Sequence, residues 1–312
     1  MRLVAISAHV PDGRIEAEEI VRAAGGSRSQ AQVFSRLFGI NQVSTAADGT
    51  SPTGAFEAVL DSLLQKHEGL APDAAIYVHA LPLQYPEGSS PLSELPDHPL
   101  LADVRTRYEV DQYNCGGMFW ALEMAESLLR SGLSRCVLLL AGDGHRGLPL
   151  SERYVPGCTL MGEAYYGLIV DNEHGGWRFA PIALHMRPEF HSGRAGTHSE
   201  MSAFFAAHNG MVKAALDETR FDWSGSSRLL PHNVNQLVWK QMSQNHDLAF
   251  DRVDLGLLPD IGHCYTADPF VLLSNLLAKA PDRQDPLTLV SVGMGAFIGA
   301  FQLHRSMNGV WQ

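Results

Sequence analysis

The sequence predicts an α/β protein in which sheets and helices form layers. Short apolar runs of strand length alternate along the chain with longer segments whose apolar residues recur at helical spacing. The alternation is present in both halves of the chain. With 312 residues, of which 45% are hydrophobic, the chain can fill the cores of about two domain-sized units. Such alternation is typical of sheets covered by helices, so we expect a layered α/β fold.

The first half supplies four expected strands and three expected helices. The strands are short apolar runs bounded by turn residues, at 3–10, 74–81, 135–141 and 165–170. The helices lie between them, at 16–24, 53–66 and 116–130. The stretch 82–99 holds five prolines and no periodicity, which indicates a surface loop or arm.

The second half repeats the pattern. Helices are expected at 201–216, 234–246 and 268–279. Leu229 and Leu230 lead into a loop, and strands are expected at 287–292 and 297–303. The polar, glycine-containing stretch 193–198 indicates another loop.

Composition excludes several classes of function. The net charge of −11 makes nucleic acid an improbable partner. No apolar run reaches about 18 residues, so we expect no membrane span. The first residues lack the basic-then-apolar layout of a secretory signal. The four cysteines show no paired spacing of the kind that metal sites or disulfide scaffolds use, so a reduced, cytoplasmic setting is expected.

The most informative stretch is Asp-Gln-Tyr-Asn-Cys-Gly-Gly at 111–117, which places Cys115 at the start of an expected helix. A thiol at that position meets unpaired amides and the positive end of the helix dipole, an environment that favours the nucleophilic thiolate. The two glycines that follow keep side-chain bulk away from an approaching thioester. Taken by itself, the stretch fits a nucleophile and a buried structural cysteine equally well.

Two histidines stand at comparable strand-to-helix junctions. His232 follows the end of a strand at Pro231, and His263 follows Gly262, which permits a tight turn before the helix near Asp268. A cysteine and two imidazoles at such junctions form the set that a buried thioester site needs. A neutral imidazole can take or give a proton and can donate a hydrogen bond to a developing enolate.

These motifs together resemble the ketoacyl synthase III family of thiolase-fold condensing enzymes. The matching pieces are Cys115 at a helix start, Pro-His-x-x-Asn at 231–235 and Gly-x-x-x-x-Ala at 262–267. The stretch 291–297 resembles the family's closing glycine loop, and 6–13 and 37–40 resemble its N-terminal signature.

The resemblance implies a thiolase-like five-layer αβαβα sandwich made of two similar halves, 1–172 with the nucleophile and 173–312 with the catalytic histidines. It implies a dimer, with an identical subunit or a related ketosynthase-like one. Cys115 would accept an acyl group as a thioester, and His232 would polarise the second substrate or act as the base. The backbone amides of Cys115 and Met294 would form the oxyanion hole.

One departure from the family concerns the reaction. His263 stands where the family normally has Asn, so the expected set is Cys-His-His, which resembles the chain-elongating ketosynthases. Two imidazoles can stabilise the enolate left when a malonyl thioester loses carbon dioxide, and we expect this condensation. The alternatives are acyl transfer to a hydroxyl or amine with His263 as the base, and a chemically silent His263.

Another departure concerns the acyl donor. Val33 and Leu37 stand where coenzyme A-loading members carry an aromatic residue and an Arg, although Phe34 and Arg36 lie one place away. A carrier-protein thioester is therefore favoured over coenzyme A, with Arg36, Lys213 and Lys240 as candidate contacts to an acidic carrier or to coenzyme A. Isolated solvated charges are an equal alternative for each. No permanently bound cofactor is expected, and these departures, with Gly-Glu-Ala-Tyr at 162–165, favour specialised metabolism.

Other candidate sites are weaker. His185, His191, His198 and His208 have spacings that match no compact metal motif, so no metal is expected. Cys264 follows the turn instead of starting a helix, which favours a packing role.

Two further classes of function stay open on the sequence. A catalytically silent partner subunit would usually lose the nucleophile, which this chain keeps. A cysteine hydrolase would need an Asp or Asn to orient its histidine, and the sequence shows no clear candidate.

Overall fold

The computed structural model describes residues 1–47, 51–67, 69–82 and 84–306. The expected strands are present as β1 (Arg2–His9), β4 (Ala74–Val78), β6 (Cys136–Asp143), β9 (Ala164–Asp171), β12 (Arg228–Pro231), β13 (Leu287–Gly293) and β14 (Phe297–Arg305). The expected helices are present as α1 (Ala17–Ala23), α3 (Pro52–Lys66), α5 (Gly117–Ser131), α6 (His198–Glu218), α7 (Gln236–Asn245) and α9 (Asp268–Lys279). Apolar periodicity therefore located these elements to within a few residues.

A single path of hydrogen-bonded strands runs through both halves, in the order β12-β13-β14-β10-β1-β9-β6-β4-β5. It includes strands that the sequence did not predict: β5 (Thr106–Val110) and β10 (Trp177–Phe179), together with β11 (Ala183–Met186), which pairs with β14. β5 was missed because it is an edge strand with an exposed centre, so it has no apolar run. β10 and β11 were missed because each is very short.

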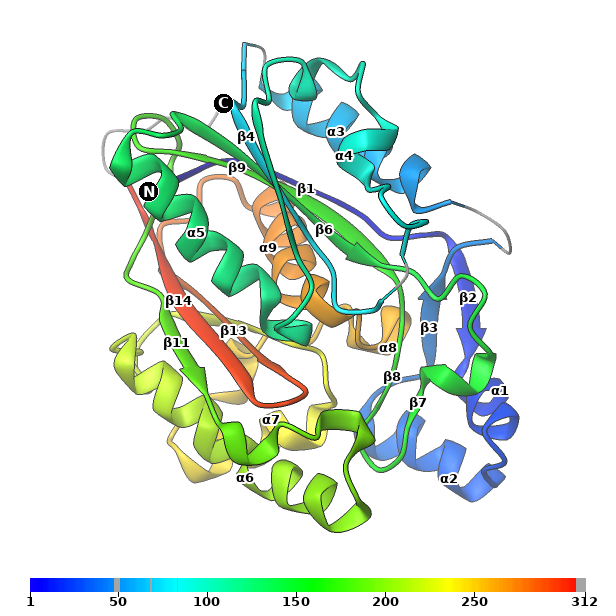
Figure 1. Cartoon of the computed structure of the whole chain (residues 1–312). Coiled ribbons are helices and arrows are strands. Elements are labelled where there is room, and N and C mark those ends of the chain that lie inside the picture. Colours follow the sequence, from blue (N-terminus) through cyan, green and yellow to red (C-terminus); the bar gives the residue numbers. More distant parts are fainter. Residues whose placement is uncertain (48–50, 68, 83, 307–312) are drawn as a thin grey trace.

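The layers follow from the helices that cover these strands (Figure 1). α3 packs on the outer face of β1 and β9, and α6 packs on β11, β13 and β14 at the opposite side of the molecule. Between them, α5 contacts β4 and β6 as well as β14, while α9 contacts β1 and β9 as well as β12 and β13. The expected five-layer αβαβα sandwich is thus confirmed.

The central layer carries the largest apolar core. Phe119 of α5 packs against Phe270 of α9 and Phe301 of β14, at ring-centroid distances of 5.8 and 5.4 Å. A Cβ at Gly299 would lie 2.2 Å from the Phe119 ring, so glycine lets the strand approach the helix. The boundary predicted between residues 172 and 173 falls in the turn from β9 to β10, and the division into halves stays a prediction.

Smaller elements surround these layers. β2 (Gly13–Glu16) pairs with β3 (Gln42–Thr45), and β7 (Tyr154–Val155) pairs with β8 (Thr159–Leu160). The short helices are α2 (Arg28–Val33), a π-helical turn at Phe34–Phe38, α4 (Pro91–Glu94) and α8 (Leu258–Ile261). The expected loop at 82–99, of which residue 83 lies outside the described part, is only partly a surface arm because α4 buries Pro91 and Leu92.

Candidate active site

Cys115 lies in a single 3-10 turn, Asn114–Gly116, that leads directly into α5. The turn from β13 to β14 packs against it, and two glycines make this approach possible. A Cβ at Gly116 would lie 2.8 Å from the Phe297 carbonyl oxygen, and one at Gly293 would lie 2.6 Å from the Tyr113 carbonyl oxygen. The prediction that Cys115 stands at a helix start is therefore confirmed, and the closing glycine loop lies against it.

His263 is the imidazole that contacts the thiol. Its Nε2 lies 3.4 Å from Cys115 Sγ. Gly262 has a φ of 68°, which only glycine adopts readily, and this turn presents His263 after α8. The two residues are 148 positions apart in the chain, so the sequence alone did not show which histidine would face the sulfur.

Asp268 lies directly behind His263 and was not recognised as a site residue from the sequence. Its carboxylate accepts a short hydrogen bond from His263 Nδ1 and further bonds from the backbone amides of Cys264 (2.7 Å) and Asn233 (2.6 Å). The side chain is fully buried. The expectation that the site lacks an Asp orienter is wrong, because the chain turns back after His263 and brings Asp268 under the ring.

The groups around His263 determine the protonation of its ring. Burial favours the neutral ring, but the charges of Asp268 and Cys115 outweigh burial and raise the pKa of His263 to about 10. The bond to Asp268 fixes the proton on Nδ1 and leaves Nε2 to exchange a proton with Sγ. Cys115, His263 and Asp268 form the geometry of a nucleophile, a base and an orienting carboxylate.

His232 belongs to the same site but has a different partner. Its ring centroid lies 6.1 Å from that of His263, while its Nε2 lies 2.9 Å from Nε2 of His208 on α6. Its Nδ1 is buried and has no hydrogen-bond partner among the described residues. His208, which the sequence placed in a loose cluster, is thus a site residue, and its distance along the chain from His232 hid the pairing.

Both rings of the second pair are neutral. Burial lowers the pKa of His208 to about 4. Burial lowers the pKa of His232 well below its usual value, and the neighbouring imidazoles of His208 and His263 lower it further. Since His208 Nδ1 lies 3.2 Å from the Asn209 Oδ1, which can only accept, the proton of His208 is on Nδ1. His208 Nε2 therefore accepts a hydrogen bond from His232 Nε2–H.

Asn114 occupies the region in which the oxyanion hole was expected. Its Oδ1 lies 3.1 Å from Cys115 Sγ and accepts a hydrogen bond of 3.0 Å from the Met294 amide. Asn114 has a φ of 47°, a left-handed conformation that Asn tolerates better than most residues. The Met294 amide therefore already has an acceptor in this structure, the same oxygen that contacts the sulfur. The oxyanion-hole roles of Cys115 and Met294 stay predictions.

A cavity of about 110 Å³ opens beside the thiol. Its lining combines the three histidines with a mostly apolar set of side chains, among them Leu81, Val155, Met161, Phe205, Val234 and Tyr265. Such a surface suits an acyl group held next to the sulfur.

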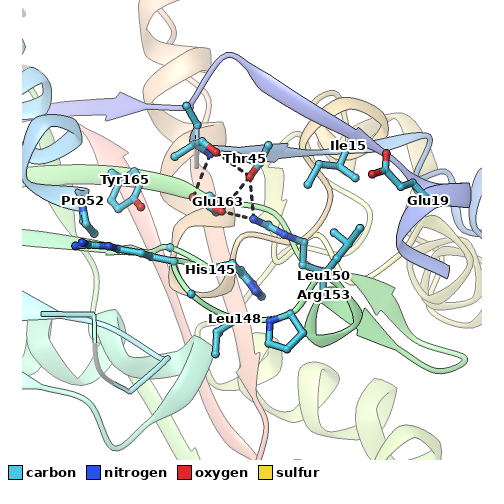
Figure 2. A pocket seen from close by; sticks show the side chains of 16 residues that line it. Ile15, Glu19, Thr45, Pro52, His145, Leu148, Leu150, Arg153, Glu163 and Tyr165 are labelled. Atoms are coloured by element: carbon cyan, nitrogen blue, oxygen red, sulfur yellow. Dashed lines mark hydrogen bonds and ion pairs between the residues drawn. The ribbon is translucent and has the colours of Figure 1, made fainter. Parts of the chain in front are cut away.

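A second hollow, of about 770 Å³, is lined by a different set of side chains, among them His145, Arg153 and Glu163 (Figure 2). Its floor contains a buried ion pair between Arg153 and Glu163, to which Thr45 adds hydrogen bonds. Glu163 belongs to the unusual run 162–165, so this pair is one structural consequence of that departure.

The candidate donor contacts lie away from the lining of the catalytic cavity. Arg36 is exposed in the π-helical turn, whereas Lys213 is ion-paired with Asp217 and lies 5.6 Å from the Trp223 ring centroid. Phe34 is buried, so it cannot replace the aromatic clamp that coenzyme A-loading members carry. The contacts of Arg36 and Lys213 with a carrier or coenzyme A stay predictions.

The remaining cysteine and histidine predictions can be checked by burial. Cys264 is buried in the core, and burial raises its thiol pKa well above the usual value, which confirms a packing role. Within the described ranges, no group of three or more His, Cys, Asp or Glu side chains could hold a metal ion. No helix in those ranges has the length and apolar character needed to cross a membrane.

Fold and site together define a thiolase-fold protein in which a cysteine at a helix start contacts a histidine. The comparisons agree: the beta-ketoacyl-[acyl-carrier-protein] synthase III of Cereibacter sphaeroides is 24% identical over 217 residues, covering 61% of this chain. The match covers 64% of that relative, less than two thirds of its length. No family model matches the chain.

Solved structures match over nearly the whole chain. The acyltransferase ChlB3 has a TM-score of 0.81 at 20% identity and covers 100% of this chain and 99% of its own. The 3-oxoacyl-(acyl carrier protein) synthase III of Pseudomonas aeruginosa has a TM-score of 0.76 at 16% identity, covering 97% and 98%. OleA of Xanthomonas campestris has a TM-score of 0.79 at 12% identity, covering 97% of this chain and 98% of its own. The resemblance to the ketoacyl synthase III-like enzymes is confirmed, and these structures establish the fold.

Proposed function

We propose that the chain is an acyltransferase that forms an acyl thioester on Cys115 and passes the acyl group to a hydroxyl or amine acceptor without decarboxylation. One observation carries the proposal: Cys115 Sγ lies 3.4 Å from His263 Nε2, and Asp268 holds the opposite side of that ring. This is the arrangement that activates a cysteine and then serves as base for an incoming acceptor.

The proton follows a simple path through these residues. His263 takes the proton of the Cys115 thiol, and the thiolate attacks the carbonyl carbon of the donor thioester. Collapse of the tetrahedral intermediate breaks the bond to the donor sulfur, which leaves as a thiol with the proton from His263. In the second half, His263 takes the acceptor's proton as its oxygen or nitrogen attacks acyl-Cys115, and returns it to the Cys115 sulfur.

The Met294 amide would stabilise the oxyanion in both halves. For this to happen, the incoming carbonyl oxygen must replace Asn114 Oδ1 as the acceptor of that amide. Its present bond of 3.0 Å shows that an oxygen atom fits the position.

The other two histidines favour transfer over condensation. Decarboxylative condensation needs hydrogen-bond donors for the enolate, and His232 Nε2–H is engaged by His208. The name of ChlB3 describes an acyltransferase, which is consistent with this preference.

Condensation with a malonyl-type thioester is the second candidate. It is favoured by the presence of two imidazoles, His232 and His263, on the lining of one cavity that also contains the nucleophile. The synthase names of the other relatives agree with it. For either reaction we propose a carrier-protein or coenzyme A thioester as donor, a role in specialised metabolism, a cytoplasmic location and a dimer with an identical or related subunit.

The test is the mass of the intact protein after incubation with acyl thioesters. We expect a single acyl adduct on the wild type and none on Cys115→Ala. Cys264→Ala is the matched control, because it removes a buried thiol that the mechanism does not use, and it should carry the adduct. An equal adduct on Cys115→Ala, or none on the wild type, would refute the proposal.

A further inference from the structure

The wall between the two cavities consists in part of one pair of side chains. Tyr265 lines the catalytic cavity, and His145 lines the larger surface hollow shown in Figure 2. The Tyr265 hydroxyl is hydrogen-bonded to His145 Nε2 over 2.7 Å, and the ring centroids are 5.6 Å apart. Both side chains are buried, so a pair of rings in contact separates the space at the thiol from the hollow.

The space on the catalytic side of this wall is small. An apolar protein cavity of about 150 Å³ holds a benzene molecule, so a cavity of 110 Å³ accommodates about four carbon atoms. The Tyr265 ring centroid lies 6.1 Å from that of His263, whose Nε2 contacts the sulfur. An acyl chain that is attached to Cys115 and extends toward Tyr265 therefore contacts the Tyr265 ring after a few carbon atoms.

We infer that Tyr265, braced by His145, limits the substrate to short acyl groups, of about two to four carbons. This inference rests on the proposed acyl-Cys115 intermediate and adds the size class of its acyl group. The hollow behind the wall, of about 770 Å³, is large enough for a longer chain once the ring is removed.

The backbone at Tyr265 indicates which substitution to make. Its φ of 53° lies in the left-handed region that glycine adopts freely and that an aromatic residue rarely adopts. Tyr265→Gly therefore removes the ring without straining the turn that positions His263 and Asp268. Tyr265→Phe is the matched control, because it keeps the ring and loses only the hydroxyl that bonds His145.

The experiment measures the rate of adduct formation on Cys115 with acetyl, butyryl, hexanoyl and octanoyl N-acetylcysteamine thioesters. On the wild type and Tyr265→Phe, acetyl and butyryl should load about ten-fold faster than octanoyl, since an overlong chain must displace packed atoms. On Tyr265→Gly the ratio between acetyl and octanoyl rates should fall to about one to three. His145→Ala opens the wall from the other side and should lower the same ratio, which keeps the test valid if one variant fails to fold.

The outcomes separate this inference from the proposed function. Equal loading of acetyl and octanoyl on the wild type would overturn the inference. So would a chain-length preference that survives in both Tyr265→Gly and His145→Ala. Absence of any adduct, with every thioester, would instead overturn the acyl-Cys115 intermediate and the inference with it.

Discussion

Replacement of Asp268 by Asn tests the part of the site that the sequence did not indicate. The substitution removes the negative charge behind His263 and keeps the shape of the side chain. Asp268 and Cys115 raise the pKa of His263 to about 10 against the opposing effect of burial. Relative to the ordinary value of 6.5, this rise corresponds to about 5 kcal/mol, at about 1.36 kcal/mol for each pH unit.

Without the carboxylate, only Cys115 opposes burial, so the pKa of His263 falls and the ring becomes a weaker base toward the Cys115 thiol. We expect the rate of acyl loading at neutral pH to fall by up to about 10³- to 10⁴-fold, which is the limit reached when the whole of that free-energy difference comes from Asp268. The range also matches the usual cost of replacing the orienting carboxylate of a catalytic histidine. Single-turnover loading, followed by the mass of the intact protein, measures this rate directly.

Asp171→Asn is the matched control. Asp171 is another buried carboxylate with an oxygen on a histidine, His174, at 2.6 Å, and it does not line the catalytic cavity. We expect it to load normally. If Asp268→Asn loads within about three-fold of the wild type, a difference of less than about 1 kcal/mol, Asp268 does not orient a catalytic base and the reasoning is wrong.

Three further predictions follow from the same site. Replacing His208 by Phe frees His232 Nε2–H, so the rate of carbon dioxide release from a malonyl thioester should rise by about 10- to 100-fold. Radiometric detection of carbon dioxide measures this rate, with Ser202→Ala on the exposed side of α6 as the control. An unchanged rate would contradict the claim that His208 keeps the His232 proton from the substrate. Because burial lowers the pKa of His208 to about 4, the folded protein resists protonation of this ring, and the free energy of unfolding should fall by about 3 kcal/mol between pH 6.5 and pH 4. Urea unfolding at pH 7 and pH 4 should show a smaller fall in the free energy of unfolding for His208→Phe than for the wild type. An equal fall in both proteins would exclude this ring as the source. Replacing Asn114 by Ala leaves the Met294 amide free to bind a thioester carbonyl, so the KM for acyl donors should fall by about ten-fold, equivalent to about 1.4 kcal/mol. Steady-state loading kinetics measure this KM. A higher KM would contradict the prediction and show that Asn114 assists binding.

Much of the fold could be predicted because apolar spacing reports directly on buried strands and helices. The central helices α5 and α9 and strands β1, β4, β6, β9, β13 and β14 all carry strong patterns. β5 and β10 carry none, since one lies at an exposed edge and the other is three residues long. Their pairing depends on neighbours that are distant in the sequence.

The site was predicted where residue type and local position were informative. Cys115, His232 and His263 were each expected at a strand-to-helix junction, and the structure brings all three to one cavity. Asp268 and His208 were missed for a physical reason. Asp268 has the sequence appearance of a helix start, and its contact with His263 depends on the left-handed turn at Tyr265. His208 reaches His232 only through the packing of α6 on the C-terminal strands.

The identity of the reaction depends on where the acyl group goes from Cys115. The most direct measurement is a single turnover of acyl-loaded protein with a malonyl thioester in one arm and an amine or alcohol acceptor in the other, recording carbon dioxide and the acylated product together. We predict that the acyl adduct decays into an ester or amide in the acceptor arm much faster than carbon dioxide is released in the malonyl arm. Carbon dioxide released in step with a new carbon–carbon bond would contradict acyl transfer and establish condensation.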